Sequence, residues 1–174
     1  MTLFHCHIAM SLDGMIARAD GGVDWLEQGA PPPEAFGFTA FYDRVETILM
    51  GRTTYEAARR MGEWPYAGKP VLVVTSRPLA DAPPGVETRP GDLPALVAEL
   101  RQRGLGLVWV EGGGQLLRGM LAIGALDRLE MAVIPVVLGD GIPLFPPGTP
   151  ETRLALRHHA AVGDALHLIY EPAR

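Results

Sequence analysis

The first part of the chain has a hydrophobic pattern typical of β-structure. Residues 3–10 alternate loosely between apolar and polar types and lead into the turn sequence Ser11-Leu12-Asp13-Gly14. We expect a second short extended segment at 15–17. After three consecutive prolines, aromatic residues recur at helical spacing, which predicts a helix from about Glu34 to Arg44.

The middle of the chain repeats one pattern three times: a short apolar run and then a segment with helical spacing. The expected strand and helix pairs are 47–50 with 53–61, 71–75 with 93–103, and 107–110 with 115–123. Recurring units of this kind favour a mainly parallel sheet with helices on both faces.

Beyond Asp127 the pattern becomes β-rich. Residues 129–138 are expected to be extended, 139–141 to turn, and segments around 152–158 and 165–170 to form late strands. These segments predict an antiparallel edge at the C-terminal end of the sheet. A chain of 174 residues with 48% hydrophobic residues can fill one core, so residues 1–174 are interpreted as one α/β domain.

Composition excludes several classes of protein. A net charge of −5 argues against a surface that binds nucleic-acid phosphates. The single cysteine, Cys6, excludes a disulfide framework or a site of several thiolates. Polar residues interrupt the N-terminal apolar run too early for a signal peptide or a membrane segment, so we expect a cytoplasmic protein that does not bind membranes.

The histidines are expected to be structural. His5 and His7 face one side of the first strand, and two such residues without a third ligand are typical of sheet-surface or hydrogen-bonded core histidines. His158 and His159 are adjacent, so in a strand they face opposite sides. No metal site is therefore expected.

Anion-binding chemistry is concentrated where three expected strands end. In open α/β sheets ligands bind at the carboxyl ends of strands, where helix N-termini present free N–H groups. Glycine permits close approach of the backbone, hydroxyl groups donate hydrogen bonds, and arginine binds two phosphate oxygens at once. The three junctions are Gly51-Arg52-Thr53-Thr54, Thr75-Ser76-Arg77 and Glu111-Gly112-Gly113-Gly114-Gln115.

The chain resembles the dihydrofolate reductase-like superfamily, and within it the RibD C-terminal domain family of riboflavin-pathway reductases, as a stand-alone member. The resemblance covers nearly the whole sequence, and its motifs come in the family's order. They are residues 8–17 (IAMSLDGMIA), 50–56 (MGRTTYE), 74–77 (VTSR), 111–114 (EGGG) and 135–145 (PVVLGDGIPLF). The resemblance implies a three-layer α/β/α fold with a mainly parallel central sheet.

The resemblance also implies a cofactor, NADPH, and residues that bind it. Ala9 and Ile16 would contact the nicotinamide end, beside a loop that contains Asp13 and Gly14. Gly51, Arg52 and Thr53 would hold phosphate. The remaining expected contacts are Thr75, Ser76 and Arg77 near the adenosine ribose 2′-phosphate, and Gly112, Gly113, Gly114, Gln115 and Leu116 around the pyrophosphate.

Three acidic residues are candidates for catalysis. Glu111 ends a strand beside the glycine run and is the acid best placed to orient substrate or cofactor; Asp13 and Glu34 are further candidates. Asp13 is equally consistent with a residue that shapes a turn. Trp25, Trp64 and Trp109 are expected to be packing groups, and the loops that hold Trp25 and Trp64 are also candidates for walls of a substrate pocket.

The resemblance implies an NADPH-dependent reductase that transfers hydride to a heterocyclic or ribosylamine substrate, as in 5-amino-6-(5-phosphoribosylamino)uracil reduction. Two alternatives stay open: a dihydrofolate or pterin reductase, and a non-catalytic module that binds NADPH. Leu116 and Leu117 replace a tyrosine that dihydrofolate reductases usually carry, which favours the riboflavin-type branch. Family members are commonly homodimers, and residues 133–141 are the candidate interface.

Overall fold

A computed structural model describes residues 1–173 of the chain. Its main sheet contains β1 (Leu3–Ser11), β3 (Thr47–Gly51), β4 (Val71–Val74), β5 (Val86–Arg89), β6 (Leu107–Gly112), β7 (Arg128–Ile134), β9 (Leu154–Val162) and β10 (Ala165–Pro172). Two short strands, β2 (Met15–Ala17) and β8 (Ile142–Pro143), pair separately. The helices are α1 (Phe38–Asp43), α2 (Arg52–Arg60), α3 (Leu93–Gln102) and α4 (Gly114–Ala122), with 3-10 turns η1 (Asp24–Leu26) and η2 (Pro33–Phe36).

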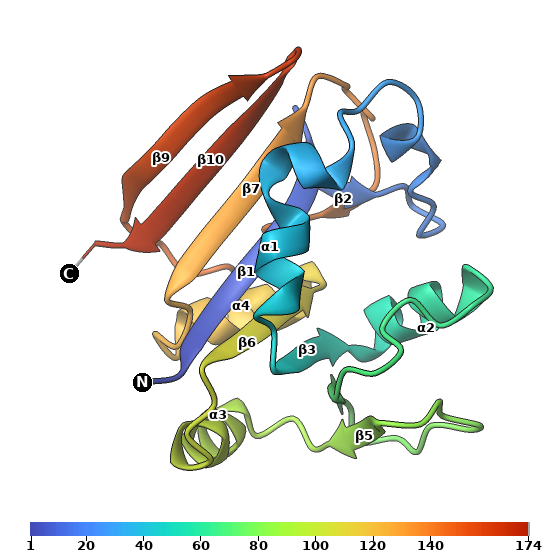
Figure 1. Ribbon diagram of the computed structural model, residues 1–174, viewed down its shortest axis with the longest axis vertical. Helices are drawn as coiled ribbons and strands as arrows, with labels where there is room; N and C mark the ends of the chain where they lie inside the picture. The colour runs from blue at the N-terminus through green and yellow to red at the C-terminus, as the bar shows by residue number, and fades with distance from the viewer. Residues whose placement is uncertain (174) are drawn as a thin grey trace.

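The order of the main sheet is β5-β4-β3-β6-β1-β7-β10-β9 (Figure 1). From β5 to β7 every neighbouring pair is parallel, whereas β10 is antiparallel to both β7 and β9. The predicted α/β class, with a mainly parallel sheet and an antiparallel C-terminal edge, is therefore confirmed.

Alternation along the strands divides the core between the two faces of the sheet. On one face, Phe4, Leu49 and Val108 pack with residues of α3 and α4. On the other face, Ile48 and Trp109 pack with residues of α1 and α2. Figure 1 shows α1 in front of the sheet and α4 behind it. The three layers arise because consecutive strand residues point to opposite faces and each face is buried by helices.

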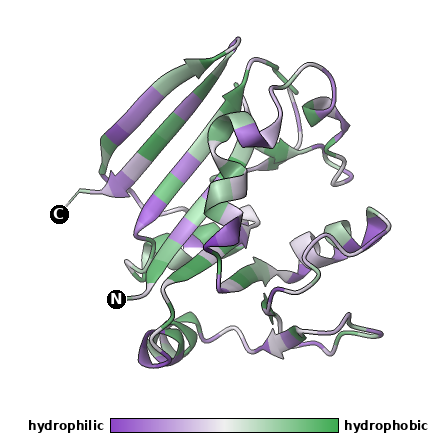
Figure 2. Ribbon diagram, in the orientation of Figure 1, coloured by the Kyte–Doolittle hydropathy of each residue, from purple (hydrophilic) through white to green (hydrophobic). Residues whose placement is uncertain are grey.

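The edge of the sheet is more polar than its centre. The outer strand β9 carries a hydrophilic stretch (Figure 2), and Arg157, His158 and His159 are exposed there. Strand β5 at the opposite edge is only half-buried. Its sequence lacks an apolar run, which is why the hydrophobic pattern did not predict it.

Two predicted elements differ in extent from the observed ones. The helix expected from about Glu34 begins instead at Phe38, because Gly37 adopts a left-handed conformation with φ 74° and ends the preceding 3-10 turn. The segment expected to be extended through residue 138 leaves the sheet after Ile134. Pro135 follows directly, and proline has no N–H to donate to a neighbouring strand.

No helix within residues 1–173 has the length and apolar character that crossing a membrane would require.

Candidate active site

A cavity of about 1050 Å³ opens where β1, β3 and β6 end. Its volume lies at the upper end of the range of about 300–1,000 Å³ that is usual for ligand pockets. The expected site residues that line it are Ala9, Ile16, Gly51, Arg52, Thr53, Glu111, Gly113, Gly114, Gln115 and Leu116. Those that do not line it are Asp13, Glu34, Thr75, Ser76, Arg77 and Gly112.

Two helix N-termini meet in this cavity because their preceding strands are neighbours. Strands β3 and β6 pair in parallel, and α2 and α4 begin directly beyond their ends. Gly51 is the N-cap residue of α2 and Gly113 that of α4, and neither helix has a side-chain cap. The free N–H groups and helix dipoles of both helices therefore favour an anion between them.

Gly114 allows α4 to lie against the β8 segment. A Cβ atom at this position would stand 2.5 Å from the carbonyl oxygen of Pro143 and 2.9 Å from that of Leu144. Both atoms belong to the backbone, so neither can move without a shift of the segment. Gly112 has a different requirement, because its φ of 128° disfavours any side chain.

We therefore expect Gly114→Ala to lower the free energy of unfolding by about 1–3 kcal/mol, through overpacking against the backbone. Urea denaturation measures this change. Gly91→Ala is the matched control, since a Cβ there meets no atom within 4 Å. An equal loss in the two variants would contradict the close approach of α4 to β8.

Arg52 connects the first turn of α2 with the loop after β4. Its Nε donates to Oε1 of Glu56 at 2.6 Å, and its Nη1 donates to the carbonyl oxygens of Arg77 and Pro78 at 3.2 and 3.1 Å. These contacts bring residues 75–78 beside the cavity although they do not line it. The side chains of Ser76 and Arg77 are exposed there.

Glu111 is the acidic side chain best placed for chemistry. It lines the cavity, and its Oε1 accepts a hydrogen bond of 3.0 Å from the hydroxyl of Tyr66. Its Oε2 is buried and has no hydrogen-bond partner among residues 1–173. Burial raises the pKa of Glu111 to about 7, against the opposing effect of the Tyr66 hydrogen bond. Burial and the nearby Glu111 carboxylate likewise raise the pKa of Tyr66.

The other two candidate acids lie outside the cavity. Asp13 accepts hydrogen bonds from the Ser11 hydroxyl (2.6 Å) and from the N–H groups of Leu138 (3.1 Å) and Gly139 (2.8 Å). These bonds, first that from Ser11, lower the pKa of Asp13 to about 2 and support its interpretation as a turn-shaping residue. Glu34 is exposed on the turn before α1.

The inner wall of the cavity is formed by His7, Phe36, Phe38 and Trp109, which sequence reasoning did not assign to a site. Trp109 Nε1 donates to the carbonyl oxygen of His7 at 3.2 Å, and the Phe38 ring packs edge-on against the indole. The alternation of side chains along the strands could have indicated this wall. β1 and β6 pair in the register His5–Trp109, so His7, Trp109 and Glu111, all odd-numbered, point to the same face of the sheet.

The tryptophans pack as expected, and the alternative role of Trp25 and Trp64 as pocket walls is not borne out. Trp25 is only 3% exposed and packs with Phe36 and Ile134 in the core, and Trp64 packs against the rings of Tyr55 and Tyr66. Neither lines the cavity, whereas Trp109 does. The sequence places Trp25 and Trp64 in loops, but it does not indicate which way their rings turn.

Known proteins resemble this chain over nearly its whole length. The family model described as "RibD C-terminal domain" matches residues 4–168. An uncharacterized protein of Bacillus subtilis, YwjB, is 38% identical over 165 residues, which cover 94% of each chain.

Solved structures show the same similarity. The crystal structure of a putative riboflavin biosynthesis protein from Shewanella sp. PV-4 has a TM-score of 0.86 at 29% identity and covers 99% of each chain. Dihydrofolate reductase from Enterococcus faecalis, complexed with NADP(H), has a TM-score of 0.67 at 19% identity, with 99% of this chain and 97% of that chain covered. The predicted dihydrofolate reductase-like fold is confirmed.

Proposed function

The chain belongs to the RibD C-terminal domain family, and on that premise we propose that it is an NADPH-dependent reductase acting on a pyrimidine ribosylamine of the riboflavin-precursor type. One observation carries this proposal: a buried carboxyl group, Glu111, shares a cavity with two uncapped helix N-termini. Hydride reduction of such a substrate needs a cofactor held by its phosphates and a proton source nearby.

The residues around the cavity fit NADPH. The N-termini of α2 and α4 suit a pyrophosphate, and a Cβ at Gly113 would meet Thr54 Oγ1 at 3.3 Å, so glycine keeps this cradle open. Ala9, Ile16 and Leu116 offer an apolar surface for the nicotinamide ring. Ser76 and Arg77, exposed beside the cavity, would bind the 2′-phosphate.

The chemistry divides between cofactor and protein. When bound, NADPH supplies the hydride. Glu111 holds a proton at the cavity wall, because burial keeps about half of this carboxyl protonated near pH 7. Tyr66 occupies Oε1 by donating to it, which leaves Oε2 as the atom that carries the proton. The rings of Phe36, Phe38 and Trp109 exclude water from the inner wall.

Cofactor choice is testable through Arg77. We expect NADPH to bind at least about tenfold more tightly than NADH, and Arg77→Ala to lose most of that preference because it removes a charge-assisted contact to the 2′-phosphate. Fluorescence titration of the purified protein with each nucleotide measures both affinities. Arg44→Ala is the matched control, since Arg44 is exposed at the far end of α1.

An assay of NADPH oxidation distinguishes the riboflavin-type reductase from a pterin reductase and from a non-catalytic module. Oxidation of NADPH with 5-amino-6-(5-phosphoribosylamino)uracil, and not with dihydrofolate, is the expected result. Turnover of dihydrofolate alone would favour the pterin branch, and tight binding without turnover of either substrate would favour a non-catalytic module. If neither nucleotide binds, the proposal fails.

A homodimer is part of the same proposal, with its interface near residues 133–141. Val133 and Ile134 are buried within the chain itself, so the apolar side chain that this stretch offers to a partner is Val137, which is 66% exposed. Sedimentation equilibrium of the wild type and of Val137→Asp tests this interface.

A further inference from the structure

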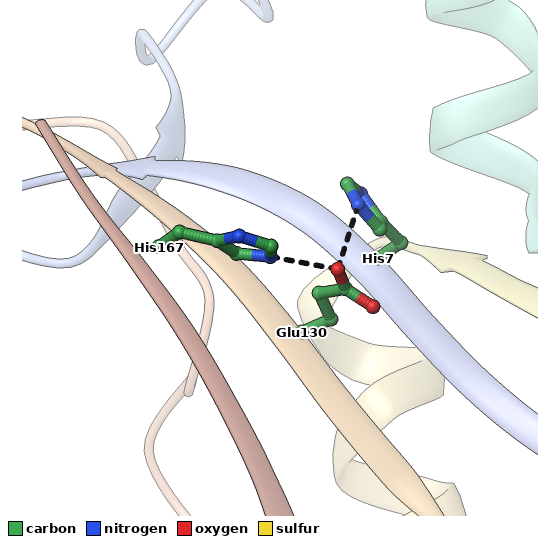
Figure 3. Close-up of side chains that lie close together, drawn as sticks. All are labelled: His7, Glu130 and His167. Atoms are coloured by element: carbon green, nitrogen blue, oxygen red, sulfur yellow. Dashed lines mark hydrogen bonds and ion pairs between the residues drawn. The ribbon is translucent and has the colours of Figure 1, made fainter. Parts of the chain in front are cut away.

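Three histidines surround one buried glutamate, Glu130, on the face of the sheet that α1 covers. Glu130 Oε1 lies 2.7 Å from His167 Nε2 and 3.3 Å from His7 Nε2, while Oε2 lies 2.9 Å from His5 Nε2. The side chains come from three adjacent strands, β1, β7 and β10, and Figure 3 shows His7 and His167 both directed at the Glu130 carboxylate. His5 and His7 are buried, as expected of core histidines, but the sequence did not indicate their contacts with Glu130.

This cluster is buried and is centred on one carboxylate. The exposed fractions of the four side chains lie between 6% and 13%. Burial alone would raise the pKa of Glu130, but the imidazoles of His5, His7 and His167 around its carboxylate together hold it well below its ordinary value. Burial also lowers the pKa of His5. The Glu130 carboxylate faces three imidazoles, and within residues 1–173 no arginine or lysine contacts it.

The donor atoms of three of these residues fit a single metal ion. His7 Nε2, Glu130 Oε1 and His167 Nε2 all lie within 4.8 Å of one another. Ligand atoms about 2.0–2.2 Å from tetrahedral zinc are separated by about 3.3 Å, which is the His7–Glu130 distance. The His167 contact, at 2.7 Å, is a hydrogen-bond length and must lengthen by about half an ångström.

We propose that His7, Glu130 and His167 form a binding site for one divalent transition-metal ion, of the zinc or cobalt class, beside the reductase cavity. Two imidazoles and one carboxylate are ligands that suit zinc, cobalt, nickel or iron(II) rather than calcium or magnesium, which prefer oxygen. Cys6 lies on the opposite face of the sheet, in the core with α3 and α4, so no thiolate enters the site.

Neighbouring groups complete the site. His5 contacts the second oxygen of Glu130 at 2.9 Å and orients the carboxylate, as outer contacts of metal ligands commonly do. His7 also lines the cavity, so the ion would adjoin the space proposed for the substrate. Phe36 packs edge-on against His167, and its carbonyl oxygen lies 3.2 Å from His7 Nε2, a contact that a metal would replace.

The test measures metal binding alone, without cofactor or substrate. Purified protein is treated with a chelator, dialysed and titrated with Co²⁺, followed by visible absorption, and with Zn²⁺, followed by calorimetry. We expect one ion per chain and a rise in Tm on addition of Zn²⁺. His167→Gln and Glu130→Gln should each weaken binding by at least about tenfold.

Two controls keep the outcomes distinct. His159→Gln removes an exposed histidine of β9 outside the cluster and should bind as the wild type does. Circular dichroism of each metal-free variant establishes that it is folded. His167 is the most exposed of the three ligands, so His167→Gln should perturb the fold least. No binding by folded wild type at about 1 mM metal, or binding lost in His159→Gln but kept in His167→Gln, overturns the proposal. The cluster is then a hydrogen-bonded network only.

Discussion

Replacing Glu111 with glutamine is expected to lower kcat/KM for the ribosylamine substrate by about 10²–10⁴-fold, the usual contribution of a general acid. Glutamine keeps the shape of the side chain and can still accept a hydrogen bond from Tyr66, but it has no acidic proton to transfer to the substrate. Because the proposal assigns the binding of NADPH to other residues, NADPH affinity should stay close to that of the wild type. Steady-state kinetics and nucleotide titration of one preparation measure both quantities.

The pH profile distinguishes a proton donor from a positioning residue. The pKa of Glu111 is raised to about 7, so kcat/KM of the wild type should fall as the pH rises above that value. Tyr66→Phe removes a hydrogen bond that stabilises the carboxylate, and the falling limb should therefore move to higher pH. A profile that does not respond to Tyr66→Phe would argue against Glu111 as the titrating acid.

Glu34→Gln tests the second candidate acid in the same assay. Glu34 is exposed and does not line the cavity, so we expect kinetics close to those of the wild type. A loss at Glu34 as large as that at Glu111 would mean that the turn before α1 reaches the substrate.

Stability is expected to depend on pH through the same carboxyl group. The folded protein retains a proton on Glu111 that the unfolded chain releases between about pH 4.5 and 7, so rising pH favours unfolding in this window. Between pH 4.5 and 8, the free energy of unfolding of the wild type should fall by about 3 kcal/mol more than that of Glu111→Gln. Urea denaturation of both proteins across this range measures the difference.

The comparison with Glu111→Gln isolates this one group. Burial lowers the pKa of His5, which alters stability in an overlapping window, but His5 is present in both proteins and its effect cancels. The pKa of Asp13 is lowered to about 2, so its contribution changes only in more acidic solution. Equal pH dependence of wild type and variant would show that Glu111 is not the buried acid described above.

The sequence predicted those parts of the structure that depend on local patterns. Buried parallel strands are continuous apolar runs, and glycine at a strand end marks the turn into a helix, so the βα units and the helix N-termini after Gly51 and Gly113 were predictable. Strand β5 was not, because a half-buried edge strand lacks the apolar run that identifies buried strands.

Predicting the inner wall of the cavity and the Glu130 cluster would have required knowledge of the order of the strands in the sheet. His7, Glu130 and His167 lie far apart in the sequence, and only the pairing of β1 and β10 with β7 brings them together. The hydrogen bond that Glu111 accepts likewise comes from a residue distant in sequence. Tyr66 lies in the loop before β4 and reaches the carboxylate through tertiary packing. No periodicity in the chain indicates such a contact.

The position of β6 in the sheet also sets the order in which this protein can fold. β6 lies between β3 and β1, and its register pairs Leu3 with Leu107, a separation of more than half the chain. Closing so long a loop costs conformational entropy before any contact compensates for it, which is typical of slow folding. On the ribosome, β1 and β3 emerge early and have no shared neighbour until residues 107–112 appear. The same strand carries Glu111, so the cavity forms only when β6 has joined the sheet.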